Sequence, residues 1–260
     1  RKAMSYHLKP SNFSNHQTFS NHQTPSNHQT FSNHSTNSTL QIIFEDYYLL
    51  AINKPGGLSS ESGKERHPSA EQEALMYFTQ QLQKNSSSKR LKETPYLRAV
   101  HRLDRASSGV LVFAKTKLAL SALMLQFEQR SVEKVYQAVV EKRPTEPAGH
   151  LVHWLLKDES GRKALISEKQ LRDSQHCILD YVTLPSEDKT ILLELHPQTG
   201  RFHQIRAQLA HIGCPIVGDI LYGGKPWREH QIKLHAQRLR FKHPKTGEEM
   251  TLEAPLPEGF

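Results

Sequence analysis

The sequence predicts an α+β protein built on a large mixed, mostly antiparallel sheet flanked by helices. Three observations support this fold class. Short runs of β-branched and aromatic residues recur along the chain, only three segments place their apolar residues at helical spacing, and strands and helices do not alternate regularly as in a doubly wound fold. At 260 residues the chain is long enough to bury a sizeable core.

The elements follow in order from local patterns, since apolar runs between turn residues predict strands and a period near 3.6 predicts helices. The first half is predicted to hold strands at 41–44 and 48–53, a helix at 69–84, a flexible loop at 85–94, a buried strand at 110–114, a helix with Thr116 as its N-cap, and a strand at 133–140. The second half is predicted to hold strands at 150–156, 177–183 and 191–196, a helix at 202–212, and a hairpin of 234–242 with 250–253.

Residues 1–39 differ from the remainder in composition. Four hexapeptides, FSNHQT, FSNHQT, PSNHQT and FSNHST, follow one another from residue 13 to residue 36. A segment so rich in Ser, Asn, His and Gln cannot bury enough apolar surface to offset its ordering entropy, so we expect a disordered tail. Its regularly spaced histidines lack the supporting contacts that fix metal geometry. We expect no metal site there, and one domain over residues 40–260.

The composition is that of a soluble protein. No apolar run approaches the roughly 18 residues that a membrane span needs, which predicts a cytoplasmic protein without a signal peptide. Two cysteines, Cys177 and Cys214, are too few for a disulfide framework and are expected to be reduced. The formal net charge of +8 favours a polyanionic partner such as nucleic acid, although an ordinary basic enzyme remains an alternative.

A first candidate site lies in VHRLDRASSGVLVFAKT, where Asp104 stands between Arg102 and Arg105 and precedes an apolar strand. Catalytic groups often occupy such loops on a rigid scaffold. A neighbouring arginine would keep the carboxylate ionised, as a nucleophile or a general base requires. From this segment alone, a structural ion pair at the strand entry is the slightly better interpretation.

A second candidate lies in HPQTGRFHQIRAQLAHIGCPIVGDILYG, in which polar residues cluster at the start of the predicted helix: Arg201, His203, Gln204 and Arg206. The helix dipole favours anions there, so the cluster suits phosphate or a buried carboxylate. His203 and His211 are eight residues apart without a third ligand nearby, so no zinc site is expected from them.

A third candidate lies in EKVYQAVVEK, where strand alternation places Tyr136 on the same face as Lys134. A tyrosine beside a cation could stack on a nucleic-acid base near a phosphate. Core packing is the better interpretation of this segment taken by itself.

These segments, in this order, resemble the RluA-type pseudouridine synthases. HRLDRASSG resembles that family's H-R-L-D signature, with Ser107 in place of the usual Thr. INKPGGL resembles its K-P-x-G-L motif and KVYQAVV its K-x-Y-x-A-x-V strand. TGRFHQIRAQLAHIGCPIVGD resembles its third motif, with Gln208 where His is usual. The resemblance covers residue 40 to the C-terminus.

The resemblance implies a pseudouridine synthase-like fold and an isomerase that converts specific uridines in rRNA or tRNA to pseudouridine, without a metal or redox cofactor. It implies that Asp104 is the catalytic nucleophile or base, that Tyr136 stacks on the target base and assists proton transfer, and that Arg206 pairs with the aspartate. Candidate RNA contacts are Arg102, Arg105, Lys134, Arg201 and His203. We expect a monomer without the S4 RNA-binding domain of many relatives.

Two rival functions remain open from the sequence. One is a catalytically idle RNA-binding protein, which would have no need of Asp104 because a carboxylate repels phosphate. The other is a hydrolase that uses Asp104, for which no second carboxylate stands at a clearly paired position in the motifs.

Overall fold

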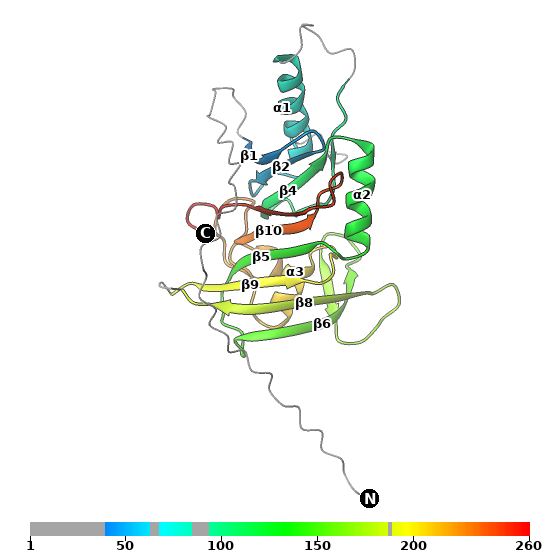
Figure 1. Cartoon of the computed structure of the whole chain (residues 1–260). Helices are drawn as coiled ribbons and strands as arrows, with labels where there is room; N and C mark the ends of the chain where they lie inside the picture. Colours follow the sequence, from blue (N-terminus) through cyan, green and yellow to red (C-terminus); the bar gives the residue numbers. More distant parts are fainter. Residues whose placement is uncertain (1–39, 63–67, 85–93, 187–188) are drawn as a thin grey trace, which may run out of the picture. The chain divides into compact units, whose positions relative to one another are not determined.

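The computed structural model describes residues 40–62, 68–84, 94–186 and 189–260 (Figure 1). The repeats of residues 13–36 and almost all of the predicted loop at 85–94 lie outside these ranges. The described strands are β1 (Gln41–Glu45), β2 (Leu49–Lys54), β3 (Arg98–Ala99), β4 (Ser108–Ala114), β5 (Glu133–Val140), β6 (Ala148–Lys157), β7 (Ala164–Ser167), β8 (Gln175–Leu184), β9 (Ile191–Pro197), β10 (Leu234–Lys242) and β11 (Glu249–Glu253). The helices are α1 (Ala70–Lys84), α2 (Lys117–Glu128), α3 (Gln204–His211) and the 3₁₀ turn Ile220–Tyr222.

These strands form one sheet in the order β1-β2-β4-β10-β5-β9-β8-β6-β7, with β11 on β10 and β3 on β4. All the described pairings are antiparallel except that of β4 with β10, so the sheet is mixed as predicted. The predicted α+β fold class is confirmed. The sequence did not reveal β3 and β7, which are short and lack clear alternation.

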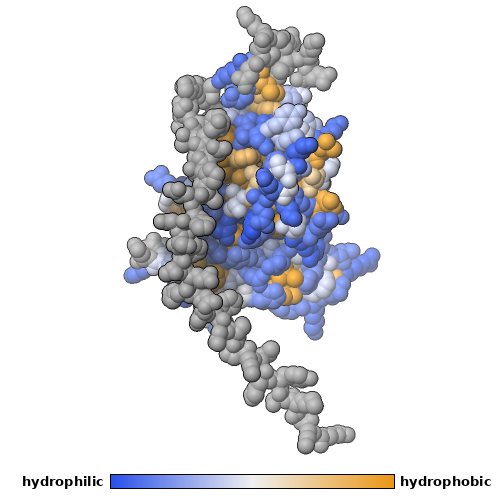
Figure 2. Space-filling model, viewed as in Figure 1, coloured by the Kyte–Doolittle hydropathy of each residue, from blue (hydrophilic) through white to orange (hydrophobic). Residues whose placement is uncertain are grey.

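Separate groups of apolar side chains hold the helices to the sheet. Leu123 of α2 packs on the group beneath β4 and β10, Phe78 of α1 packs on β2 and β4, and Leu209 of α3 packs on β5, β8 and β9. Figure 1 shows α3 behind β8 and β9 and α2 beside β4. Figure 2 shows a largely hydrophilic face with small, separate apolar patches. Helix α2 begins as predicted, since the Thr116 hydroxyl accepts the Ala119 amide at 3.1 Å.

The parallel pairing of β4 with β10 requires a glycine. Gly109 has φ +118°, and a Cβ there would lie 2.2 Å from the Ala236 carbonyl oxygen. Only glycine adopts this conformation without a clash. The pairing brings the loop before β4, which carries Asp104, to the middle of the sheet, because β10 also pairs with β5.

Helix α3 begins at Gln204, two residues later than predicted. The Gln204 side chain turns back so that its Oε1 accepts the Thr199 hydroxyl at 2.7 Å and the Arg201 amide at 3.0 Å. His203 has a left-handed φ of 52°. Arg201 and His203 therefore lie in the loop before the helix, and only Gln204 and Arg206 of the predicted cluster lie within it.

Candidate active site

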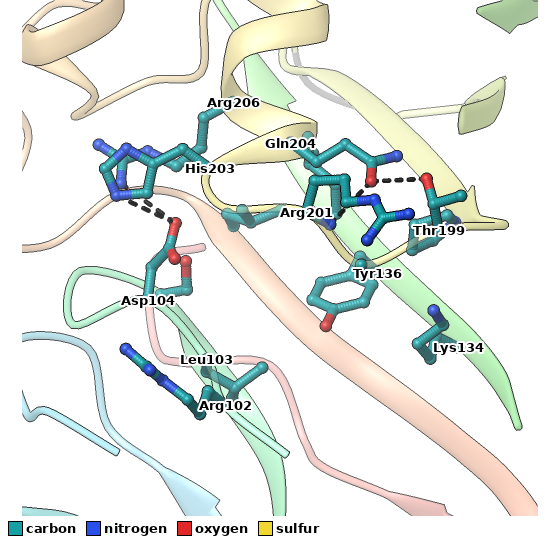
Figure 3. Close-up of a pocket in the computed structure, with 15 residues that line it drawn as sticks. Arg102, Leu103, Asp104, Lys134, Tyr136, Thr199, Arg201, His203, Gln204 and Arg206 are labelled. Atoms are coloured by element: carbon teal, nitrogen blue, oxygen red, sulfur yellow. Dashed lines mark hydrogen bonds and ion pairs between the residues drawn. The ribbon is translucent and has the colours of Figure 1, made fainter. Parts of the chain in front are cut away.

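A pocket opens where the loop before β4, strand β5 and the segment before α3 meet (Figure 3). Four segments that are far apart in the sequence supply its wall, the fourth being the start of β10. The lining residues are Arg102, Leu103, Asp104, Ser107, Lys134, Tyr136, Pro197, Thr199, Gly200, Arg201, His203, Gln204, Ile205, Arg206 and Leu234.

Asp104 and Arg206 form an ion pair at this pocket, although 102 residues separate them. Arg206 Nη1 lies 3.1 Å from Asp104 Oδ2, and His203 Nε2 lies 3.9 Å from the same oxygen. The Asp104 side chain keeps 27% of its surface exposed, whereas Arg206 keeps 7%. The carboxylate can therefore meet a molecule in the pocket while a buried cation holds it from behind.

Arg206 is itself held by a second carboxylate that the sequence reasoning did not single out. Its Nε and Nη2 donate to the two oxygens of Asp219 at 2.7 and 2.9 Å. Asp219 is 1% exposed, so the pair is almost fully desolvated. Burial alone lowers the pKa of Arg206, but the hydrogen bonds and charges of Asp219 and Asp104 outweigh burial and raise it above its usual value. The guanidinium therefore stays charged and in a fixed orientation.

Lys54 fixes the backbone of the Asp104 loop. Its side chain is fully buried, and its Nζ donates to four carbonyl oxygens: Ser107 at 2.6 Å, Leu58 at 2.7 Å, Pro55 at 2.9 Å and Arg105 at 3.4 Å. The lysine thus ties the Pro-Gly-Gly turn to the loop on both sides of Ala106. Burial lowers the pKa of Lys54 to about 7, and the charge of Asp104 acts in the opposite direction.

Tyr136 lies in the pocket between Asp104 and Lys134 (Figure 3). Burial raises the pKa of its hydroxyl, and the negative charge of Asp104 raises it further. The phenol is therefore neutral at physiological pH. It presents a flat ring and one hydroxyl proton to the pocket.

His203 reaches the pocket through its uncommon left-handed backbone. Its ring stacks on Phe202 with centroids 3.8 Å apart, and its Nδ1 lies 3.2 Å from the Tyr222 hydroxyl. Burial lowers the pKa of His203, the charge of Asp104 raises it, and the charge of Arg206 lowers it. A non-glycine residue with positive φ at a pocket is a common mark of a functional position.

Comparison with known proteins identifies the family of the chain that carries this pocket. The sequence pattern described as RNA pseudouridylate synthase matches residues 48–211. The chain belongs to the RNA pseudouridylate synthase family. Members of this family are isomerases that act on RNA, and the predicted RluA-type resemblance is confirmed.

Relatives and solved structures agree with this assignment. The chain is 33% identical over 239 residues to the tRNA pseudouridine synthase C of Vibrio cholerae, covering 84% of this chain and 92% of the relative. It is 34% identical to the ribosomal large subunit pseudouridine synthase C of Rickettsia felis, covering 86% and 70%. It also resembles the solved structure of human RNA Pseudouridylate Synthase Domain Containing 4, with a TM-score of 0.66, 25% identity, and coverage of 84% and 89%.

Four of the five residues predicted to contact RNA line the pocket of this pseudouridine synthase: Arg102, Lys134, Arg201 and His203. Arg105 does not line it, because its Nε donates to the Gly57 carbonyl at 2.9 Å. Arg102 is 76% exposed and lies 3.8 Å from Glu61, a weak contact that leaves its guanidinium accessible. Thus one flanking arginine supports the loop, and the other faces solvent at the pocket.

Sequence reasoning missed three residues that shape the site: Lys54, Asp219 and Tyr222. Lys54 and Asp219 lie inside the motifs quoted above, in KPGGL and in GD. A motif does not show which charged side chains pair with each other in the folded protein. Tyr222 lies outside them. Its ring receives the Arg206 guanidinium at 5.1 Å, and its hydroxyl accepts the Ala164 amide at 2.7 Å. No sequence signal distinguishes such a tyrosine from a core residue.

Proposed function

We propose that this chain converts specific uridines in rRNA or tRNA to pseudouridine, with Asp104 as the catalytic nucleophile or base. The observation that carries the proposal is the Asp219–Arg206–Asp104 chain, in which a buried, charged arginine holds a partly exposed carboxylate at the pocket. A carboxylate that is open to the pocket and fixed in position by a buried cation is placed for either role.

The reaction breaks the N1–C1′ bond of uridine and joins C5 of the uracil to C1′. In one route Asp104 attacks C1′ as the uracil leaves with the bonding electrons; in the other it takes the C2′ proton and a glycal forms. In both routes the uracil turns. In the first route C5 displaces the Asp104 carboxylate from C1′; in the second C5 adds to C1′ of the glycal while Asp104 returns the proton to C2′. The C5 proton is then lost and N1 gains one, so the product is an isomer of the uridine. The reaction consumes no oxidant, no reductant and no added group. We therefore propose that the enzyme needs no metal or redox cofactor for this chemistry.

Tyr136 is proposed to act as the platform for the target base. A base must leave its stack to enter a closed pocket, and an aromatic face offsets part of the stacking that it loses. The neutral phenol beside Asp104 also supplies a hydroxyl that can donate and accept protons. Its position in the pocket supports this role over simple core packing.

The remaining proposals concern RNA and the cell. Arg102, Lys134 and Arg201 would contact the RNA backbone, while Arg105 would act on it only through the loop. No helix of the described residues has the length and hydropathy of a membrane span. We propose a monomer that works in the cytoplasm, where rRNA and tRNA are found, and that residues 40–260 form the catalytic domain, so that deletion of residues 1–39 leaves the chemistry intact.

The decisive experiment compares Asp104→Asn with wild type on RNA labelled at C5 of uridine, counting the label released. We expect turnover to fall by at least about a thousandfold while RNA affinity stays within a fewfold. Asp180→Asn is the matched control, because this carboxylate pairs with His150 away from the pocket and should keep full turnover. Equal turnover in wild type and Asp104→Asn would instead favour the idle RNA-binding protein. Mapping pseudouridines in cells with and without the gene would name the substrate.

A further inference from the structure

A second cluster of polar side chains lies apart from the residues that line the pocket. His153 comes from β6, Glu168 follows the last residue of β7, and His211 ends α3. Glu168 Oε1 lies 2.6 Å from His211 Nε2 and 3.6 Å from His153 Nε2. The three ligand atoms all lie within 4.8 Å of one another. We propose that His153, Glu168 and His211 bind a divalent transition-metal ion of the Zn²⁺ class.

The spacing is close to what such an ion needs. A tetrahedral zinc site with bonds of about 2.0–2.1 Å places its ligand atoms roughly 3.4 Å apart. The two contacts of Glu168 bracket this value and all three ligand atoms lie within 4.8 Å, so rotations of the exposed Glu168 and His211 side chains would bring the ligand atoms to this spacing. Two imidazoles and one carboxylate suit zinc or its transition-metal neighbours better than Mg²⁺ or Ca²⁺, which prefer oxygen ligands.

Gln208 supplies an independent observation. It is fully buried, its Nε2 lies 3.0 Å from His153 Nδ1 and 3.2 Å from the Leu151 carbonyl, and its Oε1 has no hydrogen-bond partner among the described residues. Buried amide oxygens rarely remain unpaired. The Gln208 oxygen can therefore accept a further hydrogen bond, and the neighbouring His153 ring can donate one when its Nδ1 carries the proton.

Metal binding would provide that donor. With His153 Nε2 on the ion, its proton resides on Nδ1, and a half-turn of the Gln208 amide lets Oε1 accept it. This arrangement is the usual support of a metal-binding histidine, whose second nitrogen donates to an oxygen. The half-turn replaces the 3.2 Å bond to the Leu151 carbonyl with a contact between two oxygens and moves the amide NH₂ to the unpaired position, a cost that coordination of His153 would have to offset.

Imidazole and carboxylate bind a metal ion in their deprotonated forms, so binding at this site should weaken as the pH falls. The bound ion would tie β6 and β7 to the end of α3.

The test uses the full-length protein, stripped with a chelator, and titrates Zn²⁺ by calorimetry and Co²⁺ by visible absorption. Wild type should bind one tight equivalent, give the absorption of low-coordinate Co²⁺, and gain several degrees in melting temperature. Because residues 1–39 also contain histidines, the melting shift and the tight equivalent are the deciding readouts.

Three variants distinguish a metal site from a simple surface ion pair. His211→Ala and Glu168→Gln should each weaken the tight equivalent by at least tenfold and abolish the melting shift; both side chains are exposed enough for the variants to fold. His150→Ala is the control, because it removes another β6 histidine paired with a carboxylate and should change neither. The absence of a tight equivalent in wild type, or equal binding by His211→Ala and wild type, would overturn the site.

Discussion

Asp219→Asn tests whether the buried carboxylate, and not merely the arginine, holds the site together. The substitution keeps the shape of the side chain but removes its charge and sets an amide NH₂ against a guanidinium that cannot accept a hydrogen bond. Arg206 would keep one hydrogen bond to the remaining amide oxygen, the 3.1 Å bond to Asp104 and its contact with the Tyr222 ring. Breaking a buried ion pair costs about 3–5 kcal/mol. Since Asp104 still compensates part of the charge, we expect a loss near the lower end, about 3 kcal/mol.

A second ion pair of equal length provides the control. Arg240 Nη2 lies 2.7 Å from Glu249 Oε2, the same distance as Arg206 Nε from Asp219 Oδ2. Arg240 and Glu249 are 48% and 63% exposed, whereas Arg206 and Asp219 are 7% and 1% exposed. An exposed pair is screened by water and contributes little, so Glu249→Gln should leave the free energy of unfolding close to that of wild type.

Urea unfolding followed by tryptophan fluorescence measures both variants, and C5-label release measures turnover. We expect Asp219→Asn to lose stability and also to lower kcat at least tenfold, because a released Arg206 no longer presents Asp104 in one orientation. If Asp219→Asn costs no more stability than Glu249→Gln, burial does not strengthen this pair and the reasoning is wrong. If stability falls but kcat is unchanged, Asp219 has no role in positioning.

The remaining predictions address single groups. Tyr136→Phe keeps the ring and removes the hydroxyl, so kcat should fall about 10²-fold or more with RNA affinity unchanged; unchanged turnover would leave Tyr136 a platform only. Lys54→Met should cost several kcal/mol in urea unfolding, because the carbonyls of Pro55, Leu58, Arg105 and Ser107 lose the buried ammonium that donates to them, each bond contributing about 1 kcal/mol. Burial lowers the pKa of His101 to about 4, with Lys134 adding to the effect. Between pH 6.5 and 4 the unfolded chain therefore binds a proton that the folded chain does not. The free energy of unfolding should therefore decrease as the pH is lowered through this range, by at most about 1.4 kcal/mol per pH unit. His101→Gln should flatten that dependence, and an unaltered slope would refute the assignment.

Local chemistry allowed much of this protein to be predicted. The strand that carries Tyr136, the helix opened by Thr116 and the apolar strand after Asp104 depend on alternation, capping and turn residues within a few positions. Helix α3 starts later than predicted, because the left-handed φ of His203 interrupts the helical conformation and the Gln204 side chain accepts the Arg201 amide in the loop before the helix. Periodicity alone does not reveal such a side-chain contact.

The candidate site, too, was predicted in part from the sequence and in part set by the tertiary structure. The resemblance to the RluA-type enzymes indicated Asp104, Tyr136 and Arg206, and the structure brings all three to one pocket. From VHRLDRASSG alone the natural partners of Asp104 were Arg102 and Arg105. The structure instead directs Arg105 to the Gly57 carbonyl and Arg102 toward solvent, because the turn at Asp104 points the flanking side chains away from the carboxylate.

By itself the sequence determined the fold class, most elements, the family and the residues that carry the proposed chemistry, since each depends on neighbours in the chain or on a motif. Only the tertiary structure decided which charges meet: Asp219 with Arg206, Lys54 with four carbonyls, and His211 with Glu168 and His153. In the sequence His211 had no third ligand nearby. Its partners lie 43 and 58 residues away and are joined only when β6 and β7 pack against α3, because distance in space is set by strand order.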